Sequence, residues 1–362
     1  MQDNNQGSHY IGDGATAPDT AHAAPRHLQL SFTGSGSEYF RIWIVNALLS
    51  IVTLGIYSAW AKVRTLQYFY RNTRLDDATF DYHGSPTAIL KGRAIVFVLA
   101  LAYNLASQAS PWLALGLGMA LAAAFPYLLV RSLRFRMANS SYRGLRFAFT
   151  GKDAEGYKVF LLWPILTVLS FGLLAPLAHQ RFKRYQHNHT LFGTAPFAFD
   201  ATAGAFYGVY LRTAFMVAIF LIGGGLVGGS LAAATGQSAA AMSVVFGMMV
   251  IGLYLGLMLI GPYFATRMQN LVWNQTTLAP HSFRSDVRVG KLFFIVLTNY
   301  IFIALTLGLF YPFARVRSAR YRVESMTMIA AGPLDEFVAG EQQQVGALGD
   351  AAADWYDIDI AL

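Results

Sequence analysis

The sequence of 362 residues has no cysteine, and only 13% of its residues are charged. The lack of cysteine excludes disulfides, thiolate zinc sites and cysteine nucleophiles. Hydrophobic residues make up 55% of the chain, and the run 111–130 contains no charged residue. Apolar runs of roughly 20 residues are long enough to cross about 30 Å of hydrocarbon. The composition therefore predicts a membrane protein with several spans.

The two ends of the sequence lack apolar runs of this kind. Residues 1–27 have no basic segment followed by an apolar one, so we expect a disordered polar tail and not a signal peptide. Residues 330–362 contain seven Asp and Glu residues and no Lys or Arg. We expect residues 330–362 to form a solvated acidic tail.

Four apolar stretches predict full transmembrane helices, arranged as two hairpins. They are residues 88–107, 111–130, 206–233 and 239–268. The hairpin tips are uncharged, whereas most of the 27 Lys and Arg residues lie in the segments between the hairpins. The positive-inside rule therefore places these basic segments and both termini in the cytoplasm, and the hairpin tips outside.

A motif recurs along the chain, and its first copy reads "TLGIYSAWAKVR" from Thr53. Segments that begin at Ser170 and Thr306 align with it without gaps, and each copy has a glycine, an arginine nine residues later and a tyrosine four residues after that. Looser copies contain Pro126 and Pro262. Proline is favoured in the first turn of a helix, so we expect a fresh helix to begin at each copy.

The apolar segment 157–178 has basic residues at both of its ends. A single straight span would place one basic end outside the cell, against the charge rule. We therefore expect this segment and its partners 40–57 and 291–312 to be broken, re-entrant segments covered by the full spans. Their predicted turns are Gly55, Gly172 and Gly308. The alternative is seven ordinary spans with one basic loop outside.

Short alternating stretches such as "ATFDYHG", "RGLRFAFTG" and "APFAFD" follow the motif copies. They predict strands of a small cytoplasmic sheet. A phenylalanine recurs at a similar distance from each copy, at Phe80, Phe147, Phe197 and Phe283. The expected fold is an all-α polytopic membrane protein with internal pseudo-repeats, amphipathic interfacial helices and this sheet. We divide it into a first membrane repeat (28–150), a second (151–286) and a third, partial one (287–329).

The segment of residues 32–84, with "TLGIYSAWAKVR" at its centre, resembles the signature of the YjgN family. These are bacterial inner-membrane proteins described as a domain of unknown function. The resemblance extends from about residue 28 to about residue 323. It implies a multi-pass inner-membrane protein and supplies no catalytic residues.

Basic residues of the motif helices form a recurring set beside aromatic ones. The set is Lys62, Arg64, Arg131, Arg181, Lys183, Arg184, Arg315 and Arg317. One interpretation is interfacial anchoring, in which each basic side chain near anionic headgroups gains about 1 kcal/mol. The other is a convergent site for a phosphate or another anion, since the arginine fork suits phosphate.

Polar residues inside the apolar segments offer a second set of candidates. Asn46 and Asn299 each lie nine residues before a motif glycine, and such amides either bond across helices or line a polar path. Arg93 and Arg212 stand near the starts of two spans. They either snorkel to the interface or belong to the same path.

The sequence offers no recognisable enzyme chemistry. Its histidines do not have the spacing of zinc motifs, and no Ser, His and Asp set suggests a nucleophile. We expect no cofactor, no metal and no nucleic-acid partner, while anionic lipids and a second copy of the chain are possible partners. The leading hypothesis is a conduit or carrier with a polar path between repeats. The alternatives are a non-transporting scaffold that binds anionic lipid or a partner protein and, third, an intramembrane enzyme.

Overall fold

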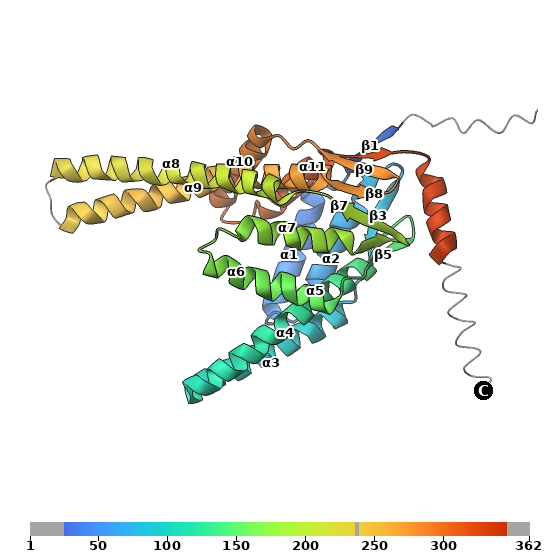
Figure 1. Ribbon diagram of the computed structural model, residues 1–362, viewed down its shortest axis with the longest axis horizontal. Helices are drawn as coiled ribbons and strands as arrows, with labels where there is room; N and C mark the ends of the chain where they lie inside the picture. The colour runs from blue at the N-terminus through green and yellow to red at the C-terminus, as the bar shows by residue number, and fades with distance from the viewer. Residues whose placement is uncertain (1–24, 236–238, 346–362) are drawn as a thin grey trace, which may run out of the picture.

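The computed structural model describes residues 25–235 and 239–345. In this part of the chain, ten strands close into an antiparallel barrel, and helices extend from one end of it (Figure 1). The strands are β1 (Arg26–Phe32), β2 (Thr73–Leu75), β3 (Ala78–Tyr82), β4 (Ser140–Tyr142), β5 (Leu145–Phe149), β6 (Thr190–Phe192), β7 (Ala195–Phe199), β8 (Thr276–Leu278), β9 (His281–Ser285) and β10 (Met326–Ala330).

The barrel closes between the two ends of the described chain. The first half of β1 pairs with β10, in the register Arg26 to Ala330, and its second half pairs with β2, in the register Leu30 to Leu75. Each remaining strand pairs with the strands before and after it in the sequence. Every strand thereby gains a neighbour on both sides, which satisfies backbone groups that an open edge would leave unpaired.

This closed barrel overturns the predicted all-α fold with a small sheet. The five-residue strands that contain Phe80, Phe147 and Phe197 were predicted from their alternation, and β3, β5 and β7 are confirmed as strands. The three-residue strands β2, β4, β6 and β8 were missed, because three residues are too few to show alternation. Without these short partners the strands could not be assembled into a barrel.

Two-residue turns connect the short strands to the long ones. Leu75 pairs with Ala78 and Tyr142 pairs with Leu145, so only two residues separate the strands of each hairpin. The second turn has positive φ at both positions, 49° at Arg143 and 80° at Gly144. Two positive φ values are the mark of a type I′ turn, whose twist matches that of the strands it joins.

Pairs of helices connect successive β-hairpins. Two of the pairs are α1 (Gly36–Val52) with α2 (Ser58–Arg71), and α3 (Pro86–Ala109) with α4 (Pro111–Ala138). Two later pairs are α8 (Ala203–Thr235) with α9 (Ala239–Asn274), and α10 (Val289–Leu305) with α11 (Tyr311–Glu324). In the middle pair, α5 (Asp153–Tyr157), a π-helical turn (Lys158–Leu162) and α6 (Trp163–Leu169) together precede α7 (Ala175–Asn188).

The helix pairs form a ring above the barrel. The second helix of each pair contacts the first helical segment of the next, as α2 contacts α3 and α9 contacts α10. The last contact, between α11 and α1, joins the end of the described chain to its beginning. The ring of helices and the barrel of strands therefore close at the same place.

Four helices in the described residues, α3, α4, α8 and α9, are long and apolar enough to cross a membrane. This confirms the four predicted apolar helices. The two looser motif copies do not start new helices, however, because Pro126 lies inside α4 and Pro262 inside α9. Membrane helices accept internal proline where neighbouring groups satisfy the freed carbonyl, so in these copies the apolar segment and the motif form one continuous helix.

The other three pairs are shorter and turn sharply between their helices. The turns contain Gly55, Gly172 and Gly308, with φ of 90°, 85° and 94°. The apolar residue before each glycine is almost fully exposed: 94% for Leu54, 97% for Phe171 and 95% for Leu307. The chain thus folds back on itself within each of the segments 40–57, 157–178 and 291–312.

Residues 334–345 form a further helix at the end of the barrel away from the helix ring (Figure 1). Leu334 and Val338 are buried in the same core cluster as the barrel strands. This part of the expected acidic tail therefore packs on the barrel instead of lying in solvent. Residues 346–362 and the predicted N-terminal tail, apart from its last residues, lie outside the described residues.

Candidate binding site along the barrel axis

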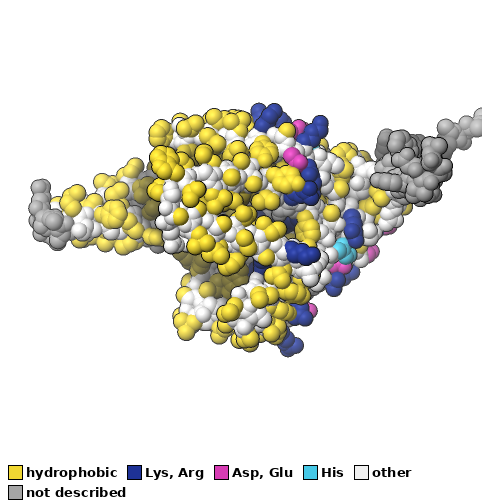
Figure 2. All heavy atoms as spheres, turned by 90° about the horizontal axis from the view of Figure 1, so that it is seen from below, with side chains coloured by type: hydrophobic (Ala, Val, Ile, Leu, Met, Phe, Trp, Pro, Cys, Tyr) yellow, Lys and Arg dark blue, Asp and Glu magenta, His cyan; other side chains and the backbone are white. Residues whose placement is uncertain are grey.

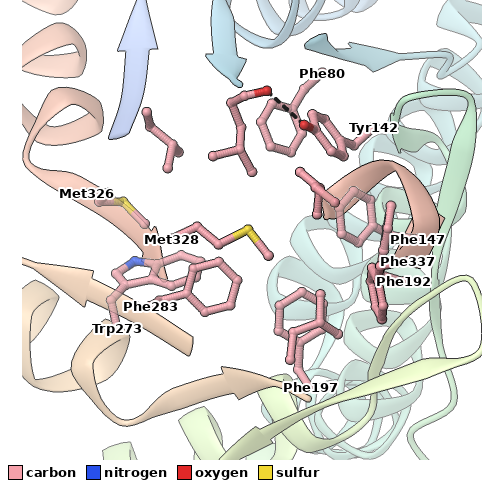
Figure 3. Close-up of a pocket in the computed structure, with 14 residues that line it drawn as sticks. Phe80, Tyr142, Phe147, Phe192, Phe197, Trp273, Phe283, Met326, Met328 and Phe337 are labelled. Carbon is pink, nitrogen blue, oxygen red and sulfur yellow. Dashed lines mark hydrogen bonds between the residues drawn. The ribbon is translucent and has the colours of Figure 1, made fainter. Parts of the chain in front are cut away.

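The barrel encloses an apolar cavity of about 140 Å³. Strand residues alternate between the two faces of a sheet, so every second side chain points inward. Figure 3 shows the rings of Phe80, Phe147, Phe197 and Phe283 around this space, together with Met326 and Met328. Tyr142 also lines it, and its hydroxyl donates to the carbonyl of Leu75 at 2.7 Å, which leaves an apolar wall.

The recurring phenylalanines account for much of this wall. Each comes from the long strand of a different β-hairpin. The ring of Phe197 lies 6.4 Å from that of Phe147 and 6.0 Å from that of Phe283, measured between centroids. These separations fall within the range of favourable aromatic pairs. The spacing noticed in the sequence therefore corresponds to a band of aromatic rings inside the barrel.

The helix 334–345 covers one end of this cavity. Phe337 lines the cavity and stacks on Phe192, with ring centroids 6.3 Å apart. The Glu341 carboxylate accepts hydrogen bonds from the backbone N–H of Thr194 at 2.6 Å and from its hydroxyl at 2.7 Å. Asp335 forms an ion pair with Arg143. The acidic residues of this helix thus fix it to the turns at the barrel rim.

A second space of about 350 Å³, the axial chamber, adjoins the cavity on the side of the helices. The chamber and the barrel cavity share Phe80, Phe147, Phe197 and Trp273 in their walls. The ends of α2, α4, α7 and α9, with Ser140 and Thr190 of two short strands, form the rest of the chamber. The chamber includes three polar side chains of α7. These are Lys183, Gln186 and His187.

Lys183 is the cation of the axial chamber, and its pKa is lowered by burial and by the nearby charge of Arg136. Its ammonium donates to the side-chain oxygen of Gln186 at 3.3 Å. No ion pair found in residues 25–235 and 239–345 includes Lys183. Burial lowers the pKa of His187 to about 4, so this ring is neutral near pH 7. The chamber therefore offers a desolvated positive charge beside an aromatic cavity, which suits an anion.

The described residues contain no group of three or more His, Asp or Glu side chains placed to hold a metal ion. The polar groups of the chamber include the Lys183 ammonium, the Gln186 amide and the hydroxyls of Tyr70, Ser140 and Thr190. Ammonium, amide N–H and hydroxyl groups can all donate hydrogen bonds to oxygen atoms of an anion.

Residues 27–355 match the model of a family described as bacterial protein of unknown function (DUF898). The chain belongs to this family. It is 23% identical to the inner membrane protein YjgN of Salmonella typhimurium over 334 residues, which cover 79% of this chain and 85% of that protein. It is 30% identical to inner membrane protein YjgN of Escherichia coli O157:H7 over 143 residues, 39% of this chain and 36% of that one. No solved structure matches the chain.

In this member of the family, the eight predicted cations do not converge on one site. Lys183 lines the axial chamber, whereas Lys62 and Arg315 line a separate cleft. Others lie on aromatic rings, as Arg131 does on Tyr127 and Arg181 on Trp163, at 5.2 and 5.9 Å. Arg64 is exposed, Arg184 is half-buried, and Arg317 bonds to Asn299. Figure 2 shows Lys and Arg side chains in a band between the apolar helices and the barrel.

The four residues of the predicted polar path are also dispersed. Asn299 bonds within the α10–α11 pair, and Arg93 donates to the hydroxyl of Ser58. Arg212 is exposed on α8. Asn46 lines the cleft that contains Lys62. None of the four lines the cavities described along the barrel axis.

Several wall residues of the axial site were not predicted as functional. Trp273 and Tyr70 occupy the last turns of α9 and α2, and they meet in the chamber with His187 from α7. The sequence signal was present, since Tyr70, Met137, His187 and Trp273 each stand three residues before the first residue of a short strand. Only the barrel shows that these equivalent positions face a common axis.

Proposed function

We propose that the protein binds an amphiphile with an anionic headgroup along the barrel axis. The observation that carries the proposal is the lysine without an acidic partner, Lys183, in a chamber that shares wall residues with an apolar cavity. An anion beside Lys183 offsets the cost of its buried charge, and a hydrocarbon chain in the aromatic cavity removes apolar surface from water.

The test compares labelled amphiphiles that share one chain and differ in the headgroup. Delipidated protein in detergent is titrated with a fluorescent fatty acid and with the matching fatty alcohol. We expect the acid to bind at least tenfold more tightly, and Lys183→Gln to remove this preference while the alcohol still binds. The control is Arg131→Gln, which removes an exposed charge outside the chamber. Equal binding of acid and alcohol to the unmodified protein contradicts the proposal.

A variant of the cavity wall tests the position of the chain. Phe147 lines both spaces, and we expect Phe147→Asp to weaken both the acid and the alcohol because it places a charge against the chain. Near-ultraviolet circular dichroism verifies that the variant is folded. If the folded variant binds both amphiphiles as the unmodified protein does, the chain does not enter the barrel.

A conduit is the second candidate, and the succession of chamber and cavity along one axis favours it. In this proposal the helix 334–345 is a stopper and not a fixed lid. Replacement of Glu341 by Gln weakens its attachment to Thr194. A conduit predicts faster efflux of a small dye from proteoliposomes that contain this variant, and unchanged efflux speaks against it.

We further propose that the chain resides in the bacterial inner membrane, with the barrel and the basic band in the cytoplasm. The inner-membrane names of the relatives and the four apolar helices support the location, and the charge rule supports the orientation. Single cysteines at Ser110 and Ser318 test it with an impermeant thiol reagent. We expect labelling of intact spheroplasts at residue 110 only, and labelling at residue 318 instead reverses the orientation.

The arrangement of elements supports an internal repeat of a different size from the one expected. We propose five units, each a helix pair followed by a β-hairpin. In the described residues, the pairs and the hairpins alternate around the ring, and the last hairpin is completed by β1 from the other end of the chain. Five sequential units divide the chain more evenly than the predicted repeats 28–150, 151–286 and 287–329.

A further inference from the structure

Asn46 marks a second site, in a cleft between α1, α2 and α11. The residue is 5% exposed, and neither its amide nitrogen nor its amide oxygen has a hydrogen-bond partner. Both atoms are themselves buried. A buried amide without partners is costly, so the position calls for a molecule that supplies the missing hydrogen bonds.

The cleft at Asn46 has a volume of about 380 Å³ and contains further polar groups. Lys62 and Arg315 supply positive charge, and Ser50, Ser58 and Thr65 supply hydroxyls. Arg315 is held in place, since its guanidinium donates to the hydroxyl of Tyr39 at 3.0 Å and lies over the ring of Phe69 at 5.0 Å. Two cations with several hydroxyl donors form an environment suited to a phosphate group.

The amide of Asn46 adds a requirement for a hydrogen-bond donor on the ligand. Its nitrogen donates, so it can bond to a phosphate oxygen, but its oxygen needs a donor. A phosphate ester that also carries a free hydroxyl satisfies both atoms. The structure thus favours phosphate esters that carry a hydroxyl over esters of choline, which have none.

The surroundings of the cleft are apolar. On α1, Leu48, Ile51 and Val52 are 56%, 72% and 78% exposed, and they follow Asn46 within two turns. A chain attached to a ligand in the cleft has this surface to lie on. The geometry points to a site for a phosphoglycerol group, either as a lipid headgroup or as a free ester. The site is separate from the axial one and does not depend on the proposed function.

Binding is measured through the fluorescence of Trp43, which lines the cleft, with delipidated protein in detergent. The probes are short-chain phosphatidylglycerol, the matching phosphatidylcholine, glycerol 3-phosphate and inorganic phosphate. We expect phosphatidylglycerol to bind at least tenfold more tightly than phosphatidylcholine. If glycerol 3-phosphate binds as tightly as phosphatidylglycerol, the ligand is a soluble ester. If it binds far more weakly than phosphatidylglycerol, the ligand is a lipid.

Variants connect the signal to the cleft. Asn46→Leu removes a side chain that bonds to nothing in the structure, so we expect it to fold and to lose the preference for phosphatidylglycerol. Lys62→Gln should weaken binding about tenfold. Arg64→Gln is the matched control, because Arg64 is an exposed cation two residues away that does not line the cleft. The proposal is overturned if neither glycerol ester binds or if Asn46→Leu binds both lipids as the unmodified protein does.

Discussion

The α1–α2 and α10–α11 pairs have the same backbone framework, but the buried asparagine of each pair differs in its hydrogen bonds. Both have a first helix of 17 residues, a second of 14 residues and a turn between them with positive φ at Leu and Gly. In each first helix, an asparagine is buried at the same position, Asn46 in one and Asn299 in the other. The backbone therefore does not explain the difference in their bonding.

The difference comes from the side chains around each amide. Asn299 donates to the carbonyl of Ala314 at 3.2 Å and to the hydroxyl of Ser318 at 3.1 Å, and it accepts from Arg317 at 3.0 Å. Asn46 has Arg64 and Thr65 at the corresponding places of α2 and bonds to neither. A buried amide with all these bonds is part of the framework. The same amide without them, beside a cleft, is available to a ligand.

The largest effect is expected from replacement of the two asparagines by leucine. Asn299→Leu removes the hydrogen bonds to Ala314, Ser318 and Arg317, so we expect it to lower the free energy of unfolding by about 2–3 kcal/mol. Asn46→Leu removes an amide without partners, and the delipidated protein should be equally or more stable. Thermal unfolding in detergent measures the stability of both variants. A larger loss of stability from Asn46→Leu than from Asn299→Leu would contradict the roles assigned to the two asparagines.

The turn glycines give a smaller and equal effect. Gly55 and Gly308 have φ of 90° and 94°, and a methyl group at either position would meet nothing within 4 Å. Only backbone strain then penalises alanine, at about 1 kcal/mol for each position. We expect Gly55→Ala and Gly308→Ala to lower the melting temperature by the same amount. Unequal shifts of the melting temperature would mean that one of the two turns contacts another molecule.

A threonine at each turn provides the third test. The Thr53 hydroxyl accepts from the backbone N–H of Tyr57 at 2.9 Å, and that of Thr306 accepts from Phe310 at the same distance. Each hydroxyl thus satisfies a free donor at the start of a second helix. Replacement by valine keeps the shape and should cost about 1 kcal/mol in both pairs. Urea titration of the two variants in detergent checks the equality, which a difference above their experimental error would refute.

The sequence predicted those features that depend on local pattern. Alternation indicated the strand of Phe147, and an apolar run indicated α8. Closure of the barrel could not be predicted in this way, because it pairs Arg26 with Ala330 from opposite ends of the described chain. Closure also requires the three-residue strands β2, β4, β6 and β8, which are too short to show alternation.

The candidate sites show the same limit. The positions of Asn46 and Lys183 were singled out from the sequence, but their roles depend on neighbours brought in by other helices. Arg315 of α11 lines the cleft of the α1–α2 pair, and Trp273 of α9 lines the same chamber as Lys183 of α7. The recurring motif made all copies look equivalent, and only the side-chain contacts of each asparagine separate a structural amide from a binding one.

The pair that contains α7 extends the comparison, since Trp163 and Pro164 occupy its asparagine position and its candidate charge is Lys183. Burial and the charge of Arg136 lower the pKa of Lys183, so its ammonium loses a proton at a lower pH than an exposed lysine does. Because the anion needs the ammonium, binding of the fatty acid to the axial chamber should weaken several-fold as the pH rises through this lowered pKa. Binding of the uncharged alcohol should stay constant over the same range. Lys183→Arg keeps the charge at every pH tested and should abolish the dependence, and a dependence that persists in this variant would assign the titration to another group.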